Sequence, residues 1–425
     1  MTASLSEATI APGAGRPVTE GPLSNPNFRR LWTGAVTAAG GTAVGSIVLT
    51  WVVYSSTRSP IAISFLGIVQ FLPTLGFGLL AGALIDRLDR RRLMLTCDLG
   101  RSAAFGTLAL YVALFGVSLS VLLGIVFAVA TFSTVFRPAT NAAVPRILGP
   151  DQLTDGNGLL QGGSTVAQFV GSPVGGVLLL TVGAAAGLAV NALTFAISAT
   201  MIFLMVIPGR PVPAEASPRR SLLAEVREGL AFLRSQRALL TITATSMAAN
   251  FFLTIWGTFL VIYSATQLHQ GAVGFSILVA TFTAGFAVGA VLPGRLHAER
   301  APGRWLLPTW GPVGVFVLAM AFTSSLPLAV LLNAIAGAML SFGNTTWLSG
   351  VQRTVPDRLM GRYFATDEAG SFAMIPAGIA VGGLLVLVAG IAWTYVIAGV
   401  GVLAINVPLF LSPSVRAWGR APVPA

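Results

Sequence analysis

Few side chains in this 425-residue chain could carry chemistry, and most of them lie inside apolar stretches. Asp98 and Arg101 are spaced i, i+3, so they can touch on one face of a helix. Asp367 and Glu368 are adjacent and point about 100° apart on a helix, so they do not share one environment. An ionisable group at membrane depth needs a partner or a function. We interpret Asp98 as half of a structural ion pair, with proton carriage as the alternative.

Glu368 and Asp367 are the leading candidates for proton coupling, followed by Asp98. For at least one of the two adjacent carboxylates, a favourable interaction with a helix amino terminus and nearby arginines is an alternative role.

Other kinds of chemistry are missing from the sequence. The chain has no lysine, so it cannot form the GxxxxGK[ST] loop that holds nucleotide phosphates. His269, His297 and Cys97 are isolated in sequence and cannot make a Cys/His zinc site or an HExxH motif. We therefore expect no enzyme activity, no cofactor, no metal and no nucleotide partner.

The elements that hold the ionisable residues are long apolar runs. The chain is 55% hydrophobic and 9% charged, with a mean hydropathy of +0.82, which is far above soluble domains. Runs of about 20 residues recur, each long enough to cross a bilayer as a helix. We expect twelve spans, at residues 30–56, 61–85, 93–115, 119–142, 158–180, 186–207, 239–263, 271–292, 305–323, 326–350, 363–389 and 391–411.

Positive charge predicts the orientation of these spans. All 25 basic residues are arginine, and if the amino terminus is cytoplasmic, Arg58 is the one that falls in an external loop. Both termini are therefore expected in the cytoplasm. Because this topology explains the net charge of +11, no nucleic-acid partner is needed. The arginine-rich, Ala- and Gly-rich composition indicates a bacterial genome of high GC content, and hence an inner (plasma) membrane protein.

A polar interruption divides the chain into two bundles of six spans. We expect a disordered cytoplasmic tail (1–27), a first bundle (28–207), a linker (208–238), a second bundle (239–411) and a cytoplasmic tail (412–425). Within the linker, leucines at helical spacing predict an amphipathic helix at the membrane surface, or alternatively an extension of span seven. The halves echo each other in GLLAGALIDR (78–87) and GFAVGAVLPG (285–294), which indicates a duplicated unit of the kind found in transporters.

Residues 82–92, GALIDRLDRRR, gather charge between spans two and three. This stretch resembles the signature loop of the major facilitator superfamily, G-x-L-a-D-R-x-G-R-R, with Asp89 in place of the second glycine. NPNFRRLWTG (25–34), FRPATNAAVPRIL (136–148) and LAEVREGLAFLR (223–234) resemble its drug:proton antiporter branch, which includes macrolide-efflux and enterobactin-exporter proteins. The resemblance extends over essentially the whole chain.

The resemblance implies a conformational latch between the signature loop and the start of span eleven. Its residues would be Gly82, Asp86, Arg87, Arg90 and Arg91. In span five, GSPVGG resembles the branch motif G-P-x-x-G-G with the proline displaced, and implies close helix packing by Gly171, Pro173, Gly175 and Gly176. Span one departs from the branch, because Thr42 stands where its members often have a carboxylate.

The superfamily pattern also implies a central cavity between the halves. Its polar and aromatic candidates are Ser46, Trp51, Gln70, Gln161, Gln168, Asn250, Trp256, Asn344 and Trp347. A cavity rich in aromatic and amide groups and poor in charge suits amphipathic molecules. Any one of these tryptophans could instead be an anchor at the lipid interface.

These observations predict a monomeric all-α membrane protein that exports a small amphipathic drug or natural product by alternating access and proton antiport. Export of a siderophore or another self-made metabolite is the alternative within transport. A polytopic membrane enzyme or receptor is the alternative of another class.

Overall fold

The computed structural model describes residues 21–206 and 230–419; the side chains at positions 75, 78–87, 299, 357, 358, 361, 365, 368 and 369 lie outside that description. The described chain is nearly all helical, as the sequence predicts. The first half contains α1 (Pro26–Thr57), α2 (Pro60–Arg87), α3 (Arg90–Phe115), α4 (Leu119–Ile147), α5 (Leu153–Thr181) and α6 (Gly183–Leu204). The second half contains α8 (Arg237–Thr258), α9 (Leu260–Ile262), α10 (Gly271–Arg295), α11 (Pro302–Trp310), α12 (Val313–Ala321), α13 (Leu326–Thr354), α14 (Asp357–Phe372), α15 (Ile375–Leu411) and α16 (Pro413–Ala417).

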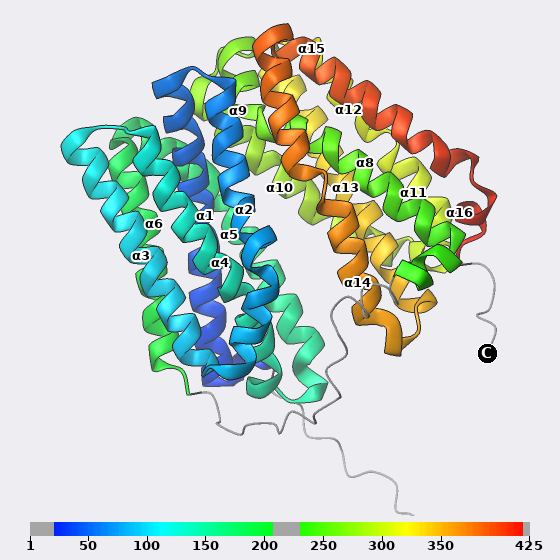
Figure 1. The fold of residues 1–425 in the computed structure, drawn as a ribbon, viewed down its shortest axis with the longest axis horizontal. Helices are drawn as coiled ribbons and strands as arrows, with labels where there is room; N and C mark the ends of the chain where they lie inside the picture. Colours follow the sequence, from blue (N-terminus) through cyan, green and yellow to red (C-terminus); the bar gives the residue numbers. More distant parts are fainter. Residues whose placement is uncertain (1–20, 207–229, 420–425) are drawn as a thin grey trace, which may run out of the picture.

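The two halves use matching helix contacts. In the first half α2 packs on α4 and α3 packs on α6; at the corresponding places of the second half, α10 packs on α13 and α12 on α15. Across the halves, α5 packs on α10 and α2 on α15. Figure 1 shows the halves as two bundles that lean together at one end. The repeated contact pattern agrees with the duplicated unit inferred from the sequence.

Eight helical stretches of the described residues are long and apolar enough to cross a membrane. Two other apolar segments are each divided into two helices. α11 and α12 are nine residues each and are separated at Gly311 and Pro312, in the region expected as span nine. α15 changes direction at Gly390, whose φ of 76° favours glycine, and its second arm runs back from the turn and diverges from the first (Figure 1). α15, within the apolar stretch Gly370–Leu411, is therefore two helices joined at Gly390.

The folded part of the chain is longer at both ends than the sequence analysis expected. Asn25 caps α1 by accepting from the backbone N–H of Asn27, and its amide donates to the Ile147 carbonyl at 2.9 Å. At the other end, Trp418 follows α16 and donates from Nε1 to Thr354 Oγ1 at 3.0 Å. Residues 21–27 and 412–419 are thus parts of the two bundles, because their side chains hydrogen-bond to neighbouring helices.

The predicted linker helix falls largely outside the described residues. Residues 230–235 are helical, and Leu233 is buried against the second half. The ring of Phe232 contacts the ring of Tyr363 on α14 edge-on at 6.5 Å. This described end of the linker therefore packs against the second bundle.

Glycines let the helices of the first half approach closely. A Cβ on Gly171 would meet the Gly40 carbonyl of α1, and one on Gly175 would lie 3.0 Å from Val44 Cα of the same helix. A Cβ on Gly176 would instead meet Ser276 of α10, in the other half. The GSPVGG stretch, with Pro173 inside α5, thus faces α1 with two glycines and the second half with the third.

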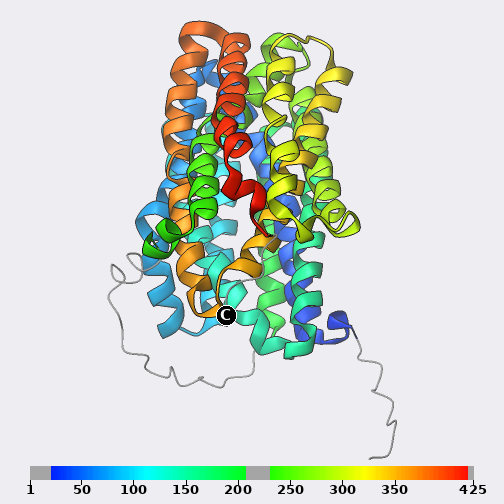
Figure 2. The ribbon, with the colours of Figure 1, turned by 90° about the vertical axis from the view of Figure 1, so that its right-hand side faces the viewer.

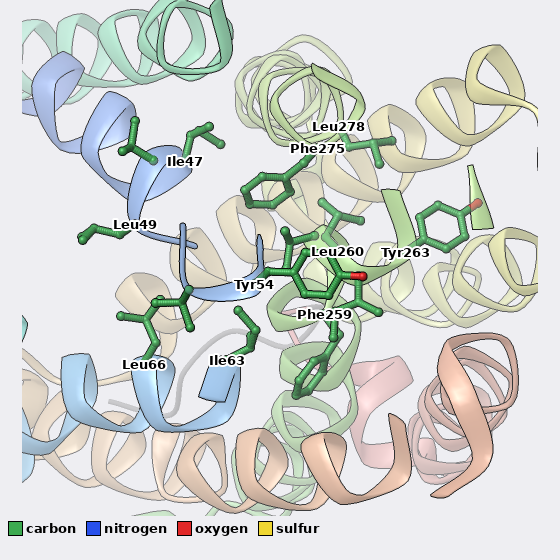
Figure 3. Packing of buried hydrophobic residues seen from close by; sticks show 14 of the residues in the cluster. Ile47, Leu49, Tyr54, Ile63, Leu66, Phe259, Leu260, Tyr263, Phe275 and Leu278 are labelled. Atoms are coloured by element: carbon green, nitrogen blue, oxygen red, sulfur yellow. The ribbon is translucent and has the colours of Figure 1, made fainter. Parts of the chain in front are cut away.

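Among the described side chains, the apolar cluster that joins the halves lies at one end of the molecule. The largest buried cluster contains residues of both halves, among them Tyr54 and Ile63 from the first and Phe259, Leu260 and Phe275 from the second (Figure 3). At the end that carries the chain termini there are instead two separate clusters. One surrounds Phe28 and Met94 in the first half, and the other surrounds Tyr363 and Trp418 in the second. The two bundles therefore meet on the side of the α1–α2 turn and diverge toward the termini (Figure 1), whereas in Figure 2 the second bundle lies in front of the first.

Candidate substrate site

A cavity of about 800 Å³ lies where α5 faces the second half. The first half contributes Gln161 and Thr165 to its described lining, and the rest comes from α8 to α15. Its aromatic side chains are Trp256, Phe282, Phe286, Trp310, Trp347, Phe364 and Phe372. Its amide side chains, besides Gln161, are Asn250, Asn333, Asn344 and Asn406. A volume of this size, mostly apolar with a few polar groups, fits a drug-sized molecule.

Five of the nine side chains predicted for the cavity line it: Gln161, Asn250, Trp256, Asn344 and Trp347. Four are not among its lining residues. Ser46, Gln70 and Gln168 are exposed on the first half. Trp51 packs against the shared apolar cluster, with its ring 5.8 Å from that of Tyr54. The described lining is therefore one-sided, because the second half supplies all of it except Gln161 and Thr165.

Asp367 is the one charged side chain among the described residues that line the cavity. It lies on α14, is 4% exposed, and accepts a hydrogen bond from Thr243 of α8. Further along the same two helices, Asn250 of α8 donates to the Ser371 carbonyl of α14 at 2.7 Å. These two contacts fix α14 on α8 and hold the carboxylate at the cavity wall. The side chain of Glu368, the neighbouring candidate for proton coupling, lies outside the described residues.

Asp98 does not line the cavity. Its carboxylate is fully buried in the first half, pairs with Arg101, and accepts from Ser198 Oγ of α6 at 2.6 Å. The Arg101 guanidinium lies 4.0 Å from the ring centre of Phe136 and 4.5 Å from that of Phe195. Such cation–π contacts and the paired carboxylate compensate a buried charge. The arrangement joins α3 to α4 and α6.

The described arginines of the signature loop hold the first half together at its terminal end. Arg90 donates to the Ala142 carbonyl of α4 at 3.0 Å. Arg91 donates to the carbonyls of Ile202 and Phe203, at the carboxyl end of α6, where a cation is favoured. Asp89 caps α3 by accepting from the Arg92 backbone N–H at 2.8 Å. The side chains of Gly82, Asp86 and Arg87 lie outside the described residues.

Sequence reasoning missed several polar residues near or in the cavity, three of which are described here. Thr243 holds the cavity carboxylate, while Asn333 and Asn406 line the cavity from α13 and the second arm of α15. The signal was present, because an asparagine inside an apolar span is costly unless its amide is bonded or faces a polar cavity. The superfamily pattern implies no cavity residue in span twelve, where Asn406 lies, whereas Thr243 and Asn333 lie in spans seven and ten, which do supply predicted residues.

Two similar helical bundles around a central cavity define a membrane transporter of the major facilitator type. The family model for transmembrane secretion effectors matches residues 18–421, so the chain belongs to this family of the major facilitator superfamily. The prediction that it is a transporter and not an enzyme is thereby confirmed, as is its place as a multi-pass protein of a bacterial inner membrane.

Two characterised relatives match along nearly their whole length. The chain is 25% identical over 399 residues to the multidrug efflux pump Tap of Mycolicibacterium fortuitum, covering 92% of this chain and 96% of the pump. It is 25% identical over 390 residues to macrolide efflux protein A of Streptococcus pyogenes, covering 89% of this chain and 94% of that protein.

Solved structures show the same fold at low identity. The peptide transporter POT in complex with sulfate aligns with a TM-score of 0.70 at 13% identity, covering 96% of this chain and 97% of that one. The nucleoside transporter NupG aligns with a TM-score of 0.68 at 14% identity, covering 90% of this chain and 98% of that one.

Proposed function

We propose that this chain is a secondary active exporter that moves small amphipathic drugs or natural products out of the cell by alternating access, in exchange for protons. The observation that carries the proposal is the aromatic, amide-rich cavity at the meeting of two similar bundles, closed at one end by apolar packing between the halves. Rocking of one bundle against the other would open this cavity to alternate sides of the membrane. The exporter acts as a monomer, since one chain supplies both halves.

The orientation follows from charge. Twelve spans with both termini in the cytoplasm leave Arg58 as the arginine of the external loops. Arg58 ends α1 at the closed side of the molecule, next to the shared apolar cluster. With this orientation the separate ends of the bundles would face the cytoplasm, in an inward-open arrangement that takes up its substrate from the cell interior.

Asp367 supports proton coupling. Its carboxylate is buried, accepts a hydrogen bond from Thr243 and lies on the cavity wall. A substrate and a proton could therefore compete for this region of the cavity. Span one, residues 30–56, has no carboxylate. Thr42 stands at the place where one is often found, and its hydroxyl donates to the Ala38 carbonyl of the same helix. Glu368 remains a second candidate from the sequence.

The substrate class rests on the lining and on the relatives. The cavity suits molecules with a broad apolar body and a few polar groups. Relatives named as multidrug and macrolide efflux proteins support drugs or natural products as substrates. No feature of the cavity favours a siderophore over these.

The test is dye efflux from cells that lack their own exporters. Cells expressing the chain are loaded with ethidium, and its release is followed by fluorescence with and without a protonophore. We expect faster release than from vector-only cells, abolished by the protonophore. Release that continues without a proton gradient would reject proton coupling. Vector-level release across antibiotics, dyes and siderophores would reject export itself.

A further inference from the structure

Four side chains on two helices of the second half form a group that we name the aromatic–carboxylate site: Asn344 and Trp347 of α13, and Phe364 and Asp367 of α14. All four line the cavity. Within each helix the two residues are three positions apart, so they are neighbours on one face. The ring centres of Trp347 and Phe364 lie 6.1 Å apart, edge-on, and this contact joins the two pairs. The site is therefore one continuous piece of the cavity wall.

A ligand in the cavity can reach this site. Asn344 is exposed, and Trp347 and Phe364 are half-buried, so part of each side chain is accessible on the cavity wall. Asp367 is buried but lies among the lining residues, where it accepts a hydrogen bond from Thr243. Two aromatic rings and an amide thus meet the ligand, and the carboxylate, on the same helix face as Phe364, adds a negative charge beside them.

The charge of the described cavity wall has one sign. Asp367 is its one charged side chain, and the other polar side chains there are hydroxyls, amides and tryptophan N–H groups. Apolar walls lower the local dielectric constant and so strengthen the attraction of a carboxylate for a cation. The faces of aromatic rings attract a cation as well, Trp more strongly than Phe. Because these forces act through space, they leave the hydrogen bond from Thr243 in place.

We propose that the aromatic–carboxylate site binds an organic cation, namely a quaternary or protonated tertiary ammonium group carried on an apolar body. The alkyl groups of such an ammonium pack against the two rings, and the Asp367 carboxylate balances its charge. An anionic molecule would be repelled by the carboxylate, and a neutral molecule would gain the apolar contact alone. The inference rests on the proposed export function and names the class of molecule that the cavity selects.

The test uses two dansyl probes of the same shape. One ends in a trimethylammonium group, and the other ends in a tert-butyl group, in which carbon replaces the charged nitrogen. Binding to the purified full-length protein in detergent is measured by dansyl fluorescence, with protein-free micelles as the blank. The wild type should bind the ammonium probe about tenfold more tightly than the tert-butyl probe.

Asp367→Asn should bring this ratio to about one, because the amide keeps the shape of the side chain but not its charge. Trp347→Leu should lower the ratio about threefold by removing one ring, and Trp347→Phe should restore most of it. Since binding is measured without a proton gradient, the ratio is independent of any coupling role of Asp367. Folded Asp367→Asn and Trp347→Leu proteins that keep the tenfold ratio would overturn the inference.

Phe286→Leu is the matched control for the ring, because Phe286 lines the same cavity from α10 and packs on Phe282, outside the aromatic–carboxylate site. It should change the affinity for both probes alike and keep their ratio. Asp151→Asn, which neutralises an exposed carboxylate on the α4–α5 turn, is the control for charge and should also keep it. Elution as a monodisperse species and an unchanged Tm identify the variants that fold. An equal loss of the ratio in Phe286→Leu and Trp347→Leu would overturn the assignment to this site.

The wild type separates failure of this inference from failure of the proposed function. A wild type that exports ethidium but binds both probes equally overturns the cation site and leaves export intact. A wild type that prefers the ammonium probe but exports neither the probes nor ethidium supports the cation site and rejects export.

Discussion

Thr243 of α8 donates a hydrogen bond to the buried carboxylate of Asp367 on α14, at the wall of the central cavity. The contact joins two helices that line the cavity from adjacent positions. The hydroxyl is one of the groups that hold this carboxylate, to which the proposed function gives the coupling role. Two predictions concern this contact, two concern charged side chains of the first half, and a fifth tests the movement of the halves.

Replacing Asp367 by Asn should abolish proton-driven export, because the amide keeps the shape of the side chain but cannot exchange a proton. We expect the initial rate of ethidium efflux under an imposed pH gradient to fall by about tenfold or more. The control is Asp151→Asn, which neutralises an exposed carboxylate on the α4–α5 turn. A normal rate in the Asp367 variant would shift the coupling role to Glu368.

Thr243→Val should slow export less than Asp367→Asn does. Valine has nearly the shape of threonine, so the substitution removes the hydrogen bond and retains the carboxylate. We expect a loss of a few-fold in the same efflux assay. Thr241→Val is the matched control, since the Thr241 hydroxyl is exposed and bonds to the Arg237 carbonyl of its own helix. Equal effects of the two substitutions would show that the Asp367 contact has no special role.

Arg101→Met should destabilise the first half strongly, because it leaves the Asp98 carboxylate buried without its cation. Removal of one partner of a buried pair costs about 3–5 kcal/mol. The double variant Asp98→Leu, Arg101→Met removes both charges and should recover much of the Tm, measured by thermal unfolding in detergent. If the double variant folds but loses proton-driven efflux, Asp98 carries protons and is more than a structural partner.

Asp89→Ala should loosen the first turn of α3. The loss of the cap costs about 1 kcal/mol of local stability. Hydrogen exchange at the backbone N–H of Arg92, which Asp89 now accepts from, should become faster. Asp89→Asn retains a capping oxygen and should exchange at the wild-type rate. An unchanged rate in the alanine variant would mean that the arginine contacts alone hold this turn.

The helical, two-bundle organisation could be predicted from the sequence because apolar length, glycine breaks and the signature loop are local signals. The positions of Asn250, Trp256 and Asn344 followed from the superfamily pattern. The one-sided cavity could not be predicted, since it depends on how far the halves separate, which is a property of packing between distant helices. Asp89 likewise looked like a departure from the signature, whereas its carboxylate is the cap of α3.

The contact between Ser64 of α2 and the α15 segment around Ile379 and Gly383 allows the closed end to be locked. Ser64 Oγ donates to the Ile379 carbonyl at 2.9 Å. A Cβ on Gly383 would lie 3.2 Å from Ser64 Cβ, close to the separation of about 3.5–4.5 Å in disulfides. Cysteines at both positions, with Cys97→Ser to remove the native thiol, should therefore cross-link when oxidised.

The most direct test of alternating access is ethidium export by this Ser64→Cys, Gly383→Cys protein before and after oxidation. The account predicts that the oxidised, cross-linked protein loses export by about tenfold or more and regains it on reduction, while each single cysteine variant exports normally in both conditions. Export by fully cross-linked protein at the rate of the reduced form would contradict the claim that the closed end must open.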